Sequence, residues 1–79
     1  MKKIIIYTSP NCYYCHQLKD FLNSHKIEFE EKDISQSQEA MEEMIRKSGQ
    51  IGVPVIDIDG EIISGFYQPE IEEKLGISK

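Results

Sequence analysis

The chain has no tryptophan, only three prolines and two cysteines among its 79 residues, and no long apolar run. The apolar stretch after Lys2-Lys3 ends after four residues at Thr8, which is too short for the core of a signal peptide. The 9 basic residues are outnumbered by 14 acidic ones, and the net charge of −5 leaves no basic patch to hold phosphates. We therefore expect a cytoplasmic protein with neither nucleic acid nor a membrane as its partner.

Linker-like, repeated and low-complexity segments are absent from the sequence as well. A chain of this length can bury one compact core but not two. Its 39% of hydrophobic and 29% of charged residues are typical of a soluble globular protein. We predict a single domain over residues 1–79, present as a monomer.

Both cysteines fall in one tetrapeptide, Cys12-Tyr13-Tyr14-Cys15. In a reducing compartment such a close pair is more often catalytic or metal-binding than structural. As a structural link it would add little, because closing so short a loop stabilises a fold by only about 2 kcal/mol. At a helix start, two residues at this spacing can close a disulfide, and the helix dipole stabilises a thiolate. The motif predicts a redox pair in which Cys12 attacks and Cys15 resolves.

The residues around this pair predict a strand followed by a helix. The apolar run at 2–8 is typical of a central strand that is buried on both faces. Apolar residues three and four apart predict a helix through about Ser24, with Asn11 as its N-cap. Cys15 then points into the core, and Cys12, as the first helical residue, lies nearer to water.

The next segment predicts a second strand and a second helix. Alternating apolar and acidic residues over 27–33 are typical of a half-buried strand near the edge of a sheet. Ser35 and Gln38 have the spacing of a capping box, and Gly49 is a suitable helix end. We expect the helix between them to bury its methionines in the core.

The last third of the chain predicts a hairpin and a short helix. Asp59-Gly60 separates two apolar segments, 53–58 and 61–64, and is a strong two-residue hairpin signal. Pro69 suits the first position of a helix that ends at Gly76.

The predicted order is therefore β-α-β-α-β-β-α. Right-handed crossovers then give a four-stranded mixed sheet with helices on both faces, a three-layer α/β/α fold. The cysteines follow the carboxyl end of a strand, where open α/β sheets form their sites.

These residues resemble the glutaredoxins and glutaredoxin-like redoxins of the thioredoxin superfamily over nearly the whole chain. The matching motifs, in family order, are Tyr7-Thr8, Cys12-Tyr13-Tyr14-Cys15-His16, Gly52-Val53-Pro54-Val55 and Ser64-Gly65-Phe66. The resemblance implies a thioredoxin-like, glutaredoxin-type fold. It also implies a dithiol enzyme that reduces protein disulfides and carries no bound cofactor.

The resemblance further implies a set of substrate-binding residues. In the family, the proline that matches Pro54 is cis and lies against the cysteine pair. The backbone of the residue that matches Val53 pairs with substrate peptide or glutathione, because a cis X-Pro bend leaves the preceding N–H and C=O free. Tyr14 matches a common aromatic position of the motif. With Gly65 and Phe66, these residues are our candidate substrate contacts.

The charged residues that hold glutathione in many family members are missing. Those members often have proline after the first cysteine, Lys or Arg three residues before it, and Gly-Gly followed by aspartate. The corresponding places hold Tyr13, Ser9 and the segment 64–68. Ser-Gly-Phe instead resembles NrdH-type redoxins, which take electrons from thioredoxin reductase and pass them to ribonucleotide reductase. Glutathione and thioredoxin reductase with NADPH are both candidate electron donors.

Metal or cluster binding is the alternative function. One Cys-X-X-Cys supplies half of a four-cysteine site, and neither His16 nor His25 stands at zinc-finger spacing. We therefore predict no metal site within one chain. Two chains could share an iron–sulfur cluster through Cys12 and Cys15, as some glutaredoxin relatives do.

Overall fold

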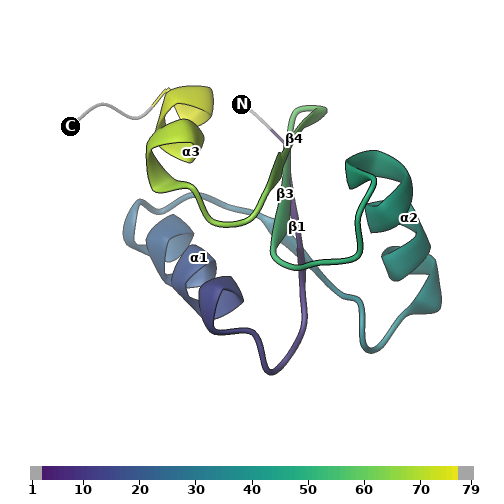
Figure 1. Cartoon of the computed structure of the whole chain (residues 1–79). Helices are drawn as coiled ribbons and strands as arrows, with labels where there is room; N and C mark the ends of the chain where they lie inside the picture. Colours follow the sequence, from purple (N-terminus) through teal and green to yellow (C-terminus); the bar gives the residue numbers. More distant parts are fainter. Residues whose placement is uncertain (1–2, 77–79) are drawn as a thin grey trace.

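The computed structural model describes residues 3–76, in which strands and helices follow one another in the predicted order (Figure 1). The elements are β1 (Ile4–Thr8), α1 (Tyr13–Ser24), β2 (Glu30–Asp33), α2 (Gln38–Ser48), β3 (Val55–Ile58), β4 (Glu61–Ser64) and α3 (Gln68–Leu75). None of the helices in this part of the chain is long and apolar enough to cross a membrane.

The strands form one mixed sheet in the order β2-β1-β3-β4. β1 pairs with β2 in parallel and with β3 antiparallel, and β3 pairs antiparallel with β4. The central position of β1 and the edge position of β2 are therefore confirmed. In the register, Tyr7 lies opposite Val55, which in turn lies opposite Ser64. The carboxyl ends of β1 and β4 and the amino end of β3 thus share one end of the sheet.

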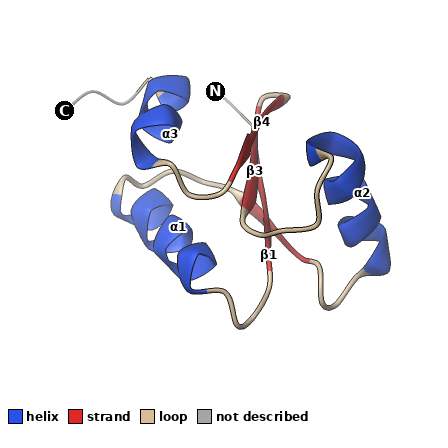
Figure 2. Ribbon diagram, viewed as in Figure 1, coloured by secondary structure: helices blue, strands red, loops and turns tan. Residues whose placement is uncertain are grey.

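Helices cover both faces of the sheet, as Figure 2 shows, with α1 and α3 on one face and α2 on the other. Side chains alternate along each strand, so each face has its own core. Ile6 and Ile56 pack in the cluster with α1 and α3, whereas Tyr7 and Val55 pack in the cluster with α2. The predicted three-layer α/β/α fold is confirmed.

The first helix begins one residue later than predicted, and its N-cap is Cys12 rather than Asn11. Cys12 has an extended backbone (φ −101°, ψ 113°), which is the conformation of a cap and not of a first helical residue. Its Sγ accepts a hydrogen bond from the Cys15 backbone N–H at 3.1 Å. The Cys12 sulfur therefore takes the capping place that the prediction gave to the Asn11 side chain.

The second helix is capped by Ser37, so the predicted capping box of Ser35 and Gln38 is wrong. The Ser37 Oγ accepts the Ala40 backbone N–H at 3.1 Å. Ser35 instead donates from its backbone N–H and its hydroxyl to Asp33 Oδ1, at 2.9 and 2.6 Å. Because Asp33 holds Ser35 in a turn, the helix cannot begin there.

Three further boundaries differ from the prediction. β2 begins at Glu30 rather than at residue 27, although the apolar side chains before it still pack against the core. β3 begins at Val55 rather than Val53, because the intervening Pro54 has no N–H to donate to a sheet ladder. Pro69 is the second residue of α3 rather than the first. Residue 2, the first of the predicted 2–8 strand, lies outside the described residues.

The hairpin turn and the last helix end agree with the prediction. Asp59 and Gly60 both have positive φ values, 54° and 94°, as a two-residue turn between antiparallel strands requires. Gly76 ends α3 in the left-handed conformation, at φ 75°.

We expect Ser37→Ala to lower the free energy of unfolding by about 1 kcal/mol, because it leaves a backbone N–H of α2 without its cap. Ser37→Asp is the matched control, since aspartate caps equally well, and it should retain the wild-type value. Urea unfolding followed by circular dichroism measures both. A Ser37→Ala protein as stable as the wild type would contradict the assigned cap.

Candidate active site

The cysteine pair follows the carboxyl end of β1 at the start of α1. Cys12 and Cys15 form a disulfide, and their Cα atoms are 5.2 Å apart, within the usual range for a bridge. Cys15 is fully buried, whereas Cys12 is partly exposed. The predicted placement of one sulfur inside and the other near water is confirmed.

The local environment of Cys12 favours a negative charge on its sulfur. The sulfur stands at the amino end of a 12-residue helix and accepts the Cys15 N–H. A helix amino terminus carries positive partial charge, which stabilises a thiolate relative to a thiol. The group nearer to water is therefore also the one whose reactive form the fold stabilises.

A second segment reaches the same end of the sheet at the start of β3. The Val53–Pro54 peptide bond is cis, as the family resemblance implied. Pro54 is buried next to Val55, which pairs with Tyr7 at the end of β1. The hydrogen bonds that join loops and turns within residues 3–76 do not include the backbone of Val53. Its N–H and C=O are therefore available to another chain.

The third segment follows β4 and is joined to the second by a backbone hydrogen bond. The Gly65 N–H donates to the Pro54 C=O at 2.7 Å, and Gly65 has a φ of 91°. Phe66 is partly buried in the α1–α3 core, with its ring centroid 6.0 Å from that of Phe21. Gly65 thus lies beside the cis-proline, whereas Phe66 anchors the segment to the core.

Large apolar side chains are exposed on these segments. Within residues 3–76 the large hydrophobic residues that remain exposed are Tyr13 (68%), Tyr14 (57%), Ile51 (65%) and Tyr67 (60%). Of them the sequence prediction included only Tyr14, which matches an aromatic position of the family motif, whereas no motif singled out the other three as substrate contacts.

Charged residues are absent from the same segments. Residues 8–18, 48–56 and 62–69 contain no Asp, Glu, Lys or Arg, although 29% of the chain is charged. We call these three stretches the site segments. Figure 1 shows their loops at the end of the sheet opposite the β3–β4 turn. The site segments therefore carry apolar and polar side chains but no charged ones of their own. Charged groups adjoin the first of them, since the Thr8 hydroxyl donates to Glu31 Oε2 at 2.7 Å and Glu31 pairs with Lys19 at 3.0 Å.

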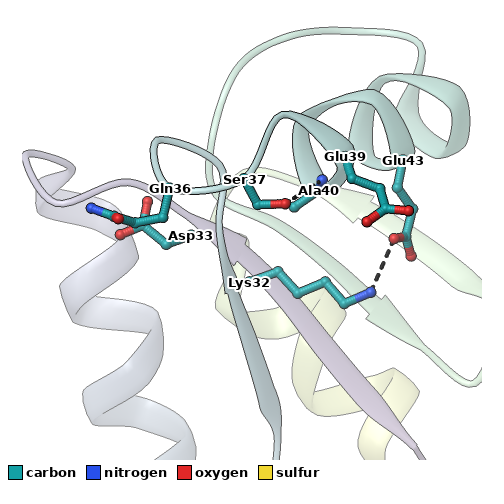
Figure 3. A pocket seen from close by; sticks show the side chains of 7 residues that line it. All are labelled: Lys32, Asp33, Gln36, Ser37, Glu39, Ala40 and Glu43. Carbon is teal, nitrogen blue, oxygen red and sulfur yellow. Dashed lines mark hydrogen bonds and ion pairs between the residues drawn. The ribbon is translucent and has the colours of Figure 1, made fainter.

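A pocket lies apart from the cysteines, between β2 and the start of α2 (Figure 3). Its lining residues are Lys32, Asp33, Gln36, Ser37, Glu39, Ala40 and Glu43. The lysine is paired within the chain, since its Nζ lies 3.0 Å from Glu43 Oε1. The other charged lining residues are all acidic, so the pocket offers no free cation for a carboxylate or phosphate ligand.

Beneath α2, a hydrogen-bonded network fixes the strand that leads to the cysteines. The fully buried Tyr7 donates from its hydroxyl to Glu43 Oε2 at 2.7 Å. Lys47 Nζ donates to the Tyr7 hydroxyl at 3.0 Å and to Asp57 Oδ2 at 2.7 Å. Hydrogen bonds from Tyr7 and Lys32 lower the pKa of Glu43 to about 2. The network joins α2 to β1 and β3, so it holds these strands in place.

Groups of three or more His, Cys, Asp or Glu side chains that could hold a metal ion do not occur within residues 3–76. The only cysteines of the chain are joined to each other.

The fold and the paired cysteines define a thioredoxin-fold dithiol protein. Comparison with protein families makes the assignment specific, because the family model described as glutaredoxin matches residues 4–63. The chain belongs to the glutaredoxin family.

Individual relatives agree with this assignment. Glutaredoxin 3 of Escherichia coli K12 is 42% identical over 65 residues, 82% of this chain and 78% of that protein. The glutaredoxin-like protein NrdH of Lactococcus lactis IL1403 is 34% identical over 68 residues, 86% of this chain and 93% of that protein. A crystal structure of the thioredoxin-like protein BC3987, mutant T8A, superposes with a TM-score of 0.92 at 31% identity, over 99% and 100% of the two chains. The protein is a thiol–disulfide oxidoreductase that acts on disulfide substrates with a reductant.

We expect stability to fall as pH falls from about 5 towards 2, in part through Glu43. Its pKa is about 2 in the folded protein and near the ordinary 4.5 when unfolded, so the unfolded chain takes up the proton first. Glu43→Gln should therefore weaken the pH dependence of the free energy of unfolding in this range. The exposed Glu42→Gln, on the same helix, is the control. Urea unfolding from pH 2.5 to 7 measures the free energy of unfolding of each protein. If both variants kept the pH dependence of the wild type, the expectation would be contradicted.

Proposed function

We propose that the protein reduces protein disulfides with Cys12 as the attacking residue and Cys15 as the resolving residue. The observation that supports this assignment is the difference between the two sulfurs. Cys12 is partly exposed at a helix amino terminus, and Cys15 is fully buried within bonding distance of it. A substrate disulfide can therefore approach Cys12 but not Cys15.

The proposed cycle moves two electrons from the dithiol to the substrate. The Cys12 thiolate attacks one substrate sulfur, and the other leaves as a thiolate that takes up a proton. Cys15, after losing its proton, then attacks Cys12 Sγ and releases the second substrate sulfur as a thiol. The protein is left with the Cys12–Cys15 disulfide that the structure contains.

The segments beside the cysteines are our proposed substrate-binding site. The available N–H and C=O of Val53 would pair with the main chain of an extended substrate, as an added strand does. The buried Pro54 holds that backbone in position, and its own C=O is already occupied by Gly65. Tyr14 contributes an exposed aromatic face next to the disulfide. Phe66 takes part indirectly, by anchoring the third segment.

We propose thioredoxin reductase with NADPH as the electron donor in preference to glutathione. Glutathione is held best by charge-assisted hydrogen bonds to its carboxylates and ammonium group. The site segments have no charged residue to supply them. With a complete cysteine pair in one chain, we further propose that the protein works as a monomer in the cytoplasm, without a resident cofactor.

We expect Cys12→Ser to abolish disulfide reduction, because the attacking thiolate is lost. Cys15→Ser should still attack but not resolve, so it should accumulate a mixed disulfide with a peptide substrate. Intact-protein mass spectrometry after mixing with an oxidised peptide measures the adduct. Activity that persisted in Cys12→Ser, or an adduct on Cys15 in that variant, would contradict the assigned roles.

We expect thioredoxin reductase and NADPH to reduce the oxidised protein at least about tenfold faster than glutathione, a difference of about 1.4 kcal/mol in activation free energy. NADPH consumption measures both reactions side by side, with glutathione reductase added to the second. Faster reduction by glutathione would contradict the proposed donor. Reduction by neither, together with coloured protein from an anaerobic preparation, would favour the cluster-bridged dimer.

A further inference from the structure

We infer that Tyr67, assisted by Tyr13, is a specificity-determining residue that selects disulfides with uncharged, apolar flanking residues over glutathione disulfide. The inference rests on the proposed function and concerns which disulfide the reduced protein attacks. Neither tyrosine is among the substrate contacts expected from the family resemblance.

Tyr67 occupies a position that helix stability does not explain. It is the N-cap of α3, yet its side chain makes no capping hydrogen bond. N-cap positions strongly favour Ser, Thr, Asp and Asn, whose side chains satisfy an orphan N–H. The tyrosine is also 60% exposed, so its ring is not needed to fill the core. Neither helix capping nor core packing therefore accounts for this ring.

The ring of Tyr67 is positioned against the proposed substrate-binding backbone. A Cβ placed on Gly65 would lie 3.1 Å from Tyr67 Cε2, so the ring lies directly on the face of Gly65. The N–H of this glycine is bonded to the Pro54 C=O, next to Val53. An extended substrate paired with Val53 would thus run close to an exposed aromatic surface.

Tyr13 provides a second aromatic surface beside the cysteines. Its hydroxyl accepts a hydrogen bond from Gln17 Nε2 at 3.0 Å, one helical turn along α1. Its ring meets that of Tyr14 edge to face, with centroids 5.3 Å apart. Both contacts restrict the side chain while leaving 68% of it exposed. A restricted, exposed tyrosine loses little entropy when it binds an apolar group.

The charge distribution determines which disulfide suits these surfaces. Glutathione disulfide carries carboxylates and ammonium groups close to its sulfurs, and burying them without partners is unfavourable. The site segments supply no charged partner. A disulfide within a polypeptide is flanked by neutral peptide groups, and apolar side chains next to it can bury area against Tyr13 and Tyr67. Apolar contact with the two tyrosines therefore favours binding of the polypeptide. Binding of glutathione disulfide is disfavoured, because its charged groups would lose water without gaining a charged partner.

Single-turnover rate constants of the reduced protein test this inference. The probes are a synthetic peptide whose disulfide is flanked by Leu and Phe, the same peptide with Asp flanks, and glutathione disulfide. We expect Tyr67→Ser to lower the rate ratio of the Leu/Phe peptide to glutathione disulfide by about three- to tenfold. Tyr13→Ser should lower the ratio in the same direction, and Tyr67→Phe should retain it.

A stability measurement on Tyr67→Ser and two further variants, Tyr67→Lys and Glu73→Ser, complete the test. Tyr67→Ser introduces a favoured N-cap residue, so α3 should be at least as stable, which urea unfolding verifies. Tyr67→Lys adds a cation and should raise the rate constant with glutathione disulfide while lowering that of the Leu/Phe peptide. Glu73→Ser, an exposed change on the same helix, should leave all three rate constants unchanged.

An equal change in all three rate constants on Tyr67→Ser would overturn the inference, because the ring would then act only through structure. A wild-type protein that reacts faster with glutathione disulfide than with the Leu/Phe peptide would overturn it too. Both results leave the oxidoreductase function in place. Wild-type protein that reduces none of the three disulfides would instead contradict the proposed function itself.

Discussion

The site depends on the backbone pairing of β3 with both of its neighbours. Because Val55 lies opposite Tyr7 on one side and Ser64 on the other, three loops that are distant in the sequence end together. The Gly65–Pro54 hydrogen bond extends this pairing one residue beyond the sheet. A shift of one residue in either pairing would turn the side chains to the opposite face and separate the loops from the cysteines. The buried network around Tyr7 resists such a shift from the α2 side.

Charge is distributed unevenly over this scaffold, and the distribution has functional meaning. The acidic residues that give the chain its net charge lie outside the site segments, many of them on α2 and α3. Some of those near the sheet are paired, as Glu43 is with Lys32 and Lys47. The segments around the cysteine pair have no charged residues of their own, so under the proposed function apolar contact and backbone hydrogen bonds would decide what binds. This composition is the basis on which we propose a polypeptide, rather than a small charged thiol, as the partner of the site.

Periodicity in the sequence was sufficient to predict the element order, the layers and the opposite exposures of Cys12 and Cys15, because burial follows directly from helix and strand spacing. It failed where neighbouring polar groups compete for the same backbone. Cys12 displaced Asn11 as a cap, and Asp33 withdrew Ser35 from α2. Tyr67 could not be predicted for another reason. Its ring lies on Gly65, two residues earlier, rather than in the core, and this loop has no helix or strand periodicity from which its exposure could be read.

The central claim is that the three site segments form one binding surface for a polypeptide disulfide. The most direct measurement is amide chemical-shift mapping of the Cys15→Ser protein joined through Cys12 to a peptide with Leu and Phe flanks. We predict the largest shifts around Cys12, at Val53 and from Gly65 to Tyr67. Shifts confined to the cysteine motif, or centred on the pocket between β2 and α2, would contradict the claim.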